Sequence, residues 1–270
     1  DSYFILIGRT GRDFFRHVTH AYDLNTLIMP IICFMAAAYA LKLRKSESVP
    51  KQLTNIIILY VLAGVALFSL RIYATHIEPY RLVIRDVELK TSKISRPVKI
   101  LHISDIQPEK VGAYESRVFQ IIDDLNPDII FFTGDLLQTQ TQADFNSELP
   151  KMMNLIHTLT PKWGIFGVYG HTDDYLHNVS KETLGGITML ESDTKEILLE
   201  NVNLLIYGLS LSESMDRKDS RAKIHRSANY KDTTFTIVFG HSPEFILEYK
   251  NENVDLCLAG HTHGGQIKIR

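Results

Sequence analysis

Five short apolar runs of this 270-residue chain are each followed by an aspartate or a histidine. A glycine or a serine stands directly before the polar residue in every case. These polar residues are Asp105, Asp135, His171, His241 and His261, and His263 follows two positions later. Carboxylates and imidazoles without thiolates suit first-row divalent metals in an open catalytic site. The pattern therefore predicts a metal site.

There are enough of these side chains for two divalent ions that share one carboxylate. Two ions about 3.5–4 Å apart can generate hydroxide and clamp the oxygens of an in-line phosphoryl displacement. The predicted reaction is hydrolysis of a phosphate ester or anhydride by hydroxide that two metal ions activate. Other hydrolases agree less well. An amidohydrolase barrel needs a long run of strands after its His-x-His, but almost nothing follows the one in this chain. In metallo-β-lactamases an aspartate stands where this chain has Gly265.

The elements that hold these residues are predicted to alternate between strands and helices. The apolar runs are typical of buried strands, at 98–103, 129–132, 165–169, 235–239 and 254–258. Helices are expected over 111–125, 145–159 and 243–249, and an antiparallel portion over 187–211. This alternation favours an α/β core with parallel pairing. Because ligands bind at the carboxyl ends of strands in such sheets, we expect the polar residues to converge.

Residues 1–80 differ in composition from the rest of the chain. Their net charge is +3, against −5 for residues 81–270, and the near-neutral total of −2 argues against a broad nucleic-acid surface. Two apolar stretches, 24–43 and 53–73, approach the ~20 residues that cross ~30 Å of hydrocarbon. We predict a membrane anchor of two transmembrane helices over 1–80, then a soluble domain over 81–270 that is truncated at its C-terminus. The alternative is a pair of buried helices.

The loop between the two apolar stretches is basic, with Lys42, Arg44, Lys45 and Lys51 against Glu47. By the positive-inside rule this loop favours the cytoplasmic side. The expected protein is then a multi-pass protein of the cell membrane, with the lipid bilayer as a partner and an extracytoplasmic catalytic domain. The opposite orientation is favoured by three arginines that precede the first stretch, Arg9, Arg12 and Arg16.

The order of the polar motifs resembles that of the calcineurin-like metallophosphoesterases. The match runs from about Pro97 to Lys268 and rests on Asp105, Gly134–Asp135, Gly170–Asp173, His241 and the run Gly260–Gly265. The hairpin before it looks like the membrane-anchored bacterial branch of that family. The resemblance implies a four-layer α/β sandwich that holds two divalent metal ions, which would be Mn, Fe, Zn, Co or Ni.

The resemblance also implies a ligand set. Its members are Asp105, Gln107, Asp135, His171, His241, His261 and His263. Asp135 would bridge the two ions, Asp105 and His263 would bind the first, and His241 and His261 the second. Gln107 and His171 stand where the family places a histidine ligand and an asparagine ligand.

Two positions weaken the match. Gln107 is a weaker donor than the histidine of the family pattern, and Thr172 replaces the imidazole that assists the leaving group, a role worth ~10²–10⁴-fold. His171 and Asp173 remain as candidate catalytic residues. The main expectation is a membrane-anchored metal-dependent phosphohydrolase, and the alternatives are a degenerate metal-binding module or a structural membrane protein.

The membrane tether and a similarity to lipid-A-precursor pyrophosphatases favour a lipid-linked phosphate or pyrophosphate as the substrate. Soluble phosphorylated small molecules remain open.

Overall fold

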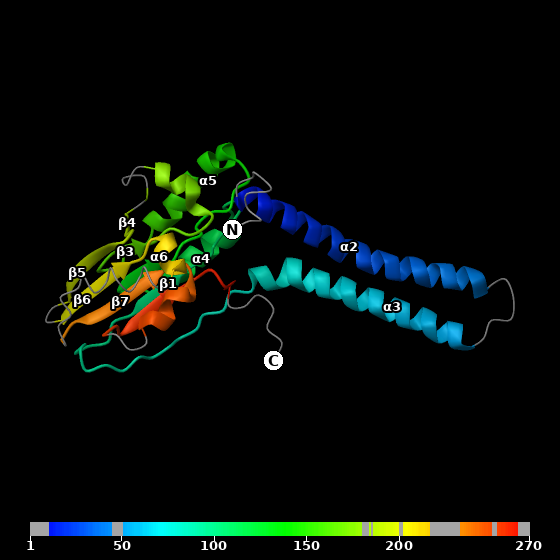
Figure 1. The fold of residues 1–270 in the computed structure, drawn as a ribbon, viewed down its shortest axis with the longest axis horizontal. Coiled ribbons are helices and arrows are strands. Elements are labelled where there is room, and N and C mark those ends of the chain that lie inside the picture. Colours follow the sequence, from blue (N-terminus) through cyan, green and yellow to red (C-terminus); the bar gives the residue numbers. More distant parts are fainter. Residues whose placement is uncertain are drawn as a thin grey trace. The chain divides into compact units, whose positions relative to one another are not determined.

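The chain forms two compact units, Asp1–Asp86 and Val87–Arg270. The computed structural model describes residues 11–44, 51–179, 184, 186–199, 202–216, 233–249 and 253–263. Figure 1 shows a pair of helices in the first unit, and strands with shorter helices in the second.

Two long helices, α2 (Gly11–Arg44) and α3 (Lys51–Ile72), lie side by side in the first unit (Figure 1). A π-helical turn, η1 (Tyr73–Ile77), and a 3-10 turn, η2 (Glu78–Tyr80), continue α3. Helix α2 begins well before residue 24, where the apolar stretch starts, and the residues that precede the stretch mix charged and apolar side chains.

Small side chains and one polar bond join the two helices. Ala37 and Ala40 pack against Ile57, and the Phe34 ring lies so close to Gly64 that a Cβ there would come within 2.9 Å of it. The guanidinium of Arg71 donates to the hydroxyl of Thr26.

Most apolar side chains of this pair face outward. The stretches Thr26–Leu43 and Thr54–Tyr80 are long and apolar enough to cross a bilayer, and only 22% and 11% of the residues in their most apolar 18-residue windows are buried. A core helix of a soluble protein buries most of its apolar face. The outward-facing side chains therefore favour an apolar surrounding.

The described residues of the second unit form two four-stranded sheets. The first is entirely parallel, in the order β1 (Ile100–Ile103), β2 (Ile129–Phe132), β3 (Ile165–Gly167) and β4 (Ile187–Met189). The second is mixed, in the order β5 (Asp193–Leu199), β6 (Val202–Gly208), β7 (Phe235–Gly240) and β8 (Leu256–Ala259). Strands β5 and β6 pair antiparallel and the remaining pairs are parallel. The antiparallel pair lies within 187–211, where the sequence predicts an antiparallel portion.

Helices cover the outer face of the parallel sheet. They are α4 (Ala113–Asp124) and α5 (Gln142–His157). Near the start of each helix, a side chain accepts a hydrogen bond from a free backbone N–H group. Glu115 accepts from Gly112 N at 2.7 Å, and the Thr141 hydroxyl accepts from Asp144 N at 3.1 Å. These caps set where the helices start.

Alternate residues of β2 face different cores. Ile130 and Phe132 pack with α4 and α5, whereas Ile129 and Phe131 pack between the two sheets. On the far side of the mixed sheet, a third cluster joins β6 and β7 to the 3-10 helix η4 (Pro243–Tyr249), and the short helix α6 (Leu211–Met215) packs beside η4. The layers run helix, sheet, sheet, helix, which is the expected α/β sandwich.

Candidate metal centre

The loops that follow β1 and β2 are tied together by their backbones. Asp105 N donates to Gly134 O at 3.1 Å, and Gln107 N donates to Asp135 O at 3.2 Å. Since β1 and β2 are parallel neighbours, both aspartates lie at the same edge of the sheet. One ligand atom from each of Asp105, Asp135 and His241 lies within 4.8 Å of the others.

His241 follows β7 and is fully buried. Its Nδ1 lies 2.7 Å from Thr133 O, and a carbonyl oxygen only accepts hydrogen bonds, so Nδ1 carries the proton. The lone pair of the neutral ring is then on Nε2, which lies 3.5 Å from Asp135 Oδ2. A carbonyl that fixes the ring through its other nitrogen is the usual arrangement of a metal-binding histidine.

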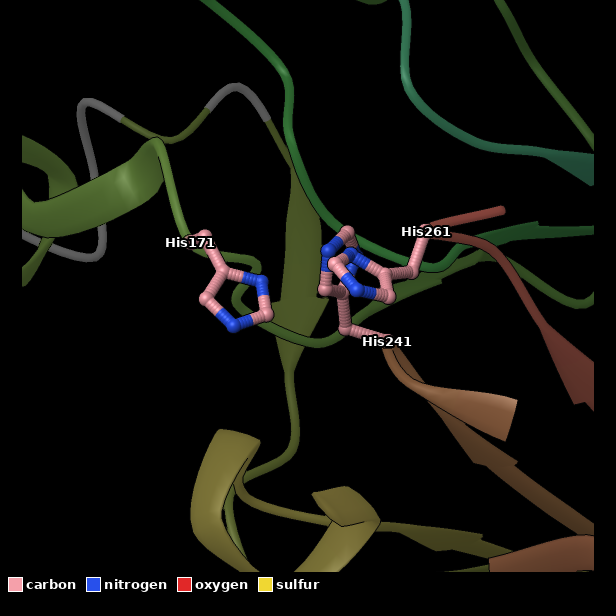
Figure 2. A group of neighbouring side chains, drawn as sticks. All are labelled: His171, His241 and His261. Atoms are coloured by element: carbon pink, nitrogen blue, oxygen red, sulfur yellow. The ribbon is translucent and has the colours of Figure 1, made fainter. Parts of the chain in front are cut away.

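His171, His241 and His261 come from three separate loops and turn their rings toward one another (Figure 2). The ring centroids of His171 and His261 are 4.7 Å apart, and each lies 5.1 Å from that of His241. Burial, with a smaller effect from the two neighbouring imidazoles, lowers the pKa of His171. The ring is therefore neutral at physiological pH and offers a lone pair.

A second set of side chains near Asp135 contains more oxygen atoms. Gln107 Nε2 donates to Asp135 Oδ2. His263 Nε2 lies 3.4 Å from Asp105 Oδ1, and the backbone N of His261 donates to Asp105 Oδ2 at 2.9 Å.

Three buried polar atoms test whether these residues fit a metal ion. Among the described residues, Asp105 Oδ1, His171 Nδ1 and His241 Nε2 have no hydrogen-bond partner. A buried polar atom without a partner costs about 1–3 kcal/mol. All three belong to the two potential ligand groups that share His241. The lone pairs of these groups repel one another and attract a cation. The donor set therefore fits divalent metal ions.

A family comparison agrees with this geometry. The calcineurin-like phosphoesterase model matches residues 98–265. The chain belongs to the calcineurin-like phosphoesterase family. It is a hydrolase of phosphoester bonds, and members of this family generally use divalent metal ions.

Relatives agree with this assignment. Two metallophosphoesterases of Bacillus subtilis, YkoQ and YkuE, are each 27% identical to the chain. The matches cover 68% and 73% of this chain and 70% of each relative. The UDP-2,3-diacylglucosamine pyrophosphatase LpxG of Chlamydia muridarum is 22% identical, over 73% of this chain and 74% of its own length.

The backbone of this metallophosphoesterase is left-handed at five candidate ligand positions. The positive φ angles are 53° at Asp105, 44° at Gln107, 58° at Asp135, 68° at His261 and 47° at His263. A left-handed conformation costs about 1–2 kcal/mol for a residue with a side chain. Strain of this kind persists where the surrounding structure enforces it, which is typical of functional sites.

Gly260 lets the last loop approach the first. A Cβ there would overlap Ser104 Oγ and lie 2.6 Å from Asp105 Oδ2. Gly134 is constrained in two ways, since its φ is +89° and a Cβ would lie 2.8 Å from His241 Nδ1. These glycines are needed for contact between the loops.

Asp173 lies at the start of the 3-10 helix η3 (Asp173–Asn178) and is buried, with 2% of its surface exposed. Its Oδ2 accepts from Asp135 N at 2.7 Å and from Gly170 N at 2.8 Å, and its Oδ1 accepts from Leu136 N at 2.9 Å. Burial raises the pKa of Asp173 to about 6, and the three N–H groups act in the opposite direction. The carboxylate joins the β2 loop to the β3 loop.

The structure thus brings all the sequence-predicted site residues into one region. Six lie in the cluster around Asp135, which are Asp105, Gln107, His171, His241, His261 and His263, and Asp173 accepts hydrogen bonds from the Asp135 backbone. Sequence reasoning missed the Thr133 carbonyl, which fixes His241, and the Thr172 N–H, which donates to Asp135 Oδ1 at 2.9 Å. Both are main-chain groups, so no side-chain pattern signals them. Gly264 and Gly265 lie outside the described residues.

Proposed function

We propose that this metallophosphoesterase hydrolyses a phosphate ester or anhydride with the help of two divalent metal ions. The observation that carries the proposal is the convergence of two potential ligand groups, one of three imidazoles and one that contains Asp105, Asp135 and His241. Two divalent ions bound there would activate water and neutralise charge on the phosphoryl oxygens.

Each candidate residue has a proposed role. Asp135 serves both ions, and its position is held by Thr172 N–H and by the backbone bonds to Asp173. The other proposed ligands are Asp105, Gln107 and His263 for the first ion, and His171, His241 and His261 for the second. Asp173 positions the Asp135 loop and does not transfer a proton, because backbone N–H groups occupy its oxygens.

The side chains also bear on the leaving group. Thr172 offers no acidic proton at neutral pH, Asp173 is sealed from solvent, and His171 is neutral. A leaving group that departs readily as an anion needs no proton from the enzyme. Phosphoanhydrides and aryl phosphates meet this condition better than alkyl phosphates do. We therefore favour a pyrophosphate bond as the one cleaved.

The similarity to LpxG, which is named for a pyrophosphatase of a diacylated sugar nucleotide, supports a lipid-linked pyrophosphate as the substrate. We further propose that residues 1–80 anchor residues 81–270 in the cell membrane as a multi-pass hairpin. The outward-facing apolar side chains of α2 and α3 support the anchor, and the basic residues between the two stretches support an extracytoplasmic catalytic domain.

The test is metal-dependent release of p-nitrophenol from mono- and bis-p-nitrophenyl phosphate by the full chain in detergent. We expect turnover with Mn²⁺ that Asp135→Asn abolishes. The matched control is Asp123→Asn, since Asp123 lies exposed near the end of α4. Absence of turnover with every divalent metal, in a protein that is folded, would contradict the proposal.

A second candidate function is a degenerate metal-binding module with little or no hydrolase activity. Two observations favour it. Thr172 supplies no imidazole, and Gln107 donates a hydrogen bond to Asp135 where a metal ligand would offer a lone pair. Metal analysis combined with the same assay separates the two functions. One bound ion with no turnover, even at millimolar Mn²⁺, would support the module.

A further inference from the structure

The two potential ion positions differ in their donor atoms. His171, His241 and His261 provide three ring nitrogens, and the carboxylate of Asp135 is 3.5 Å from the nearer ring nitrogen of His241. Three imidazoles and one carboxylate are a set that Zn²⁺ and Co²⁺ bind well. The other position has two carboxylates, one amide and one imidazole, and such oxygen-rich sets suit Mg²⁺ and Mn²⁺.

Gln107 adds a second asymmetry. Its Nε2 donates a hydrogen bond to Asp135 Oδ2, so the amide presents a hydrogen and not a lone pair to the carboxylate. To bind a cation through Oε1, the amide must turn over and give up this bond. Asp135 Oδ1 meanwhile accepts from Thr172 N at 2.9 Å. Both oxygens of the shared carboxylate therefore already accept hydrogen bonds, and one of these bonds comes from Gln107 in the oxygen-rich position.

The imidazole rings of the other position carry no comparable obstacle, although they share the Asp135 carboxylate. His241 is fixed by Thr133 O with Nε2 free to bind, and Nε2 of His241 and Nδ1 of His171 are buried without hydrogen-bond partners among the described residues. Nothing needs to rearrange in these two rings before a cation is bound. Pre-organised donors lose less free energy on binding than donors that must first be released.

We propose that the two positions load unequally: His171, His241, His261 and Asp135 bind one Zn²⁺ or Co²⁺ tightly, whereas the position beside Gln107 takes a second, harder cation weakly. The proposal rests on the proposed function, which assumes two bound metal ions. If loading is unequal, hydrolysis requires the weak position to be filled. Metal stoichiometry is measured without substrate, so a failure of unequal loading is distinguishable from a failure of hydrolysis.

The experiment is equilibrium dialysis of the full chain in detergent against Co²⁺ or Zn²⁺, read by elemental analysis and by the visible spectrum of bound Co²⁺. We expect one tightly held ion per wild-type chain. Gln107→His, which supplies a nitrogen donor in place of the amide, should raise the tightly held number to two. His171→Ala, which removes one ring nitrogen, should weaken the ion at the three-imidazole position by at least about tenfold, since even outer partners of metal ligands change affinity about 10–100-fold.

The matched control is His157→Ala, which removes an exposed imidazole at the end of α5; it should leave the stoichiometry at one. Far-UV circular dichroism establishes that each variant is folded, and if Gln107→His fails to fold, His171→Ala decides alone. Two ions of equal affinity in the wild type would overturn the proposal. So would a tightly held ion whose affinity and Co²⁺ spectrum are unchanged in His171→Ala.

Discussion

Replacing Asp173 by asparagine separates positioning from proton transfer. The carboxylate accepts three backbone N–H bonds, at 2.7, 2.8 and 2.9 Å, which join two of the loops around Asp135. Above pH 6 the side chain is ionised, given its pKa of about 6. Asparagine keeps the shape but has one acceptor oxygen, so its NH₂ group must face at least one of the N–H donors.

The size of the effect follows from these bonds. Hydrogen bonds to a charged group contribute about 1.5–3 kcal/mol each, and a buried donor without a partner costs about 1–3 kcal/mol. Two bonds reduced to neutral strength and one lost lower the free energy of unfolding, but removal of the buried charge, whose desolvation raises the pKa, offsets part of this loss. We expect a net decrease of about 1–2 kcal/mol for Asp173→Asn at pH 8. Displacement of Asp135 by about 1 Å would lower kcat by about 10²-fold.

The assay combines urea unfolding at pH 8 with hydrolysis of aryl phosphates whose leaving groups differ in pKa. A positioning residue should lower kcat by the same factor for every leaving group. A proton donor should matter most for the poorest leaving groups and little for stability. The control is Asp174→Asn, an exposed neighbour. Unfolding within about 0.5 kcal/mol of the wild type, together with a rate loss that grows for poor leaving groups, would refute the positioning role.

Three further predictions concern the supports of the site. Hydrogen bonds from Lys151 and from Val111 N lower the pKa of the buried Glu148 below its ordinary value of 4.5, so its stabilising contribution exists above that pH and is lost as the pH falls through the lowered pKa. Glu148→Gln should therefore lower Tm at pH 7, and the difference from the wild type should shrink as the pH falls below 4.5, as seen by circular dichroism. Gly260→Ala, whose Cβ would overlap Ser104, should cost about 1–3 kcal/mol in urea unfolding and weaken Co²⁺ binding. Chelation should lower Tm, because an ion at 100 times its Kd stabilises the fold by about 2.7 kcal/mol; an unchanged Tm would argue against bound metal.

The sequence predicts the sheets well, because apolar runs bounded by glycine identify buried parallel strands. The run 129–132 coincides with β2, and parallel pairing then brings Asp105 and Asp135 to one edge. Helix starts are less predictable: α2 begins at Gly11, since a segment of mixed charged and apolar residues can be helical without belonging to the apolar stretch.

Within the site, the residue types are predictable but their contacts are not. The donation from Gln107 to Asp135 and the three N–H bonds to Asp173 depend on loop geometry, and the sequence pattern does not contain this information. Asp173 accordingly looks like a candidate acid in the sequence, whereas its burial and its hydrogen bonds in the structure support a positioning role.

The left-handed backbone at the candidate ligands limits how this enzyme can diverge. At Asp105, Asp135 and His261, aspartate, asparagine, histidine and glycine tolerate such a conformation, whereas β-branched residues do so poorly. Random mutation at these codons thus samples a narrower set of usable amino acids than the metal chemistry alone would permit. Laboratory evolution toward new substrates is better directed at right-handed positions such as Thr172, where many side chains can be introduced without backbone strain.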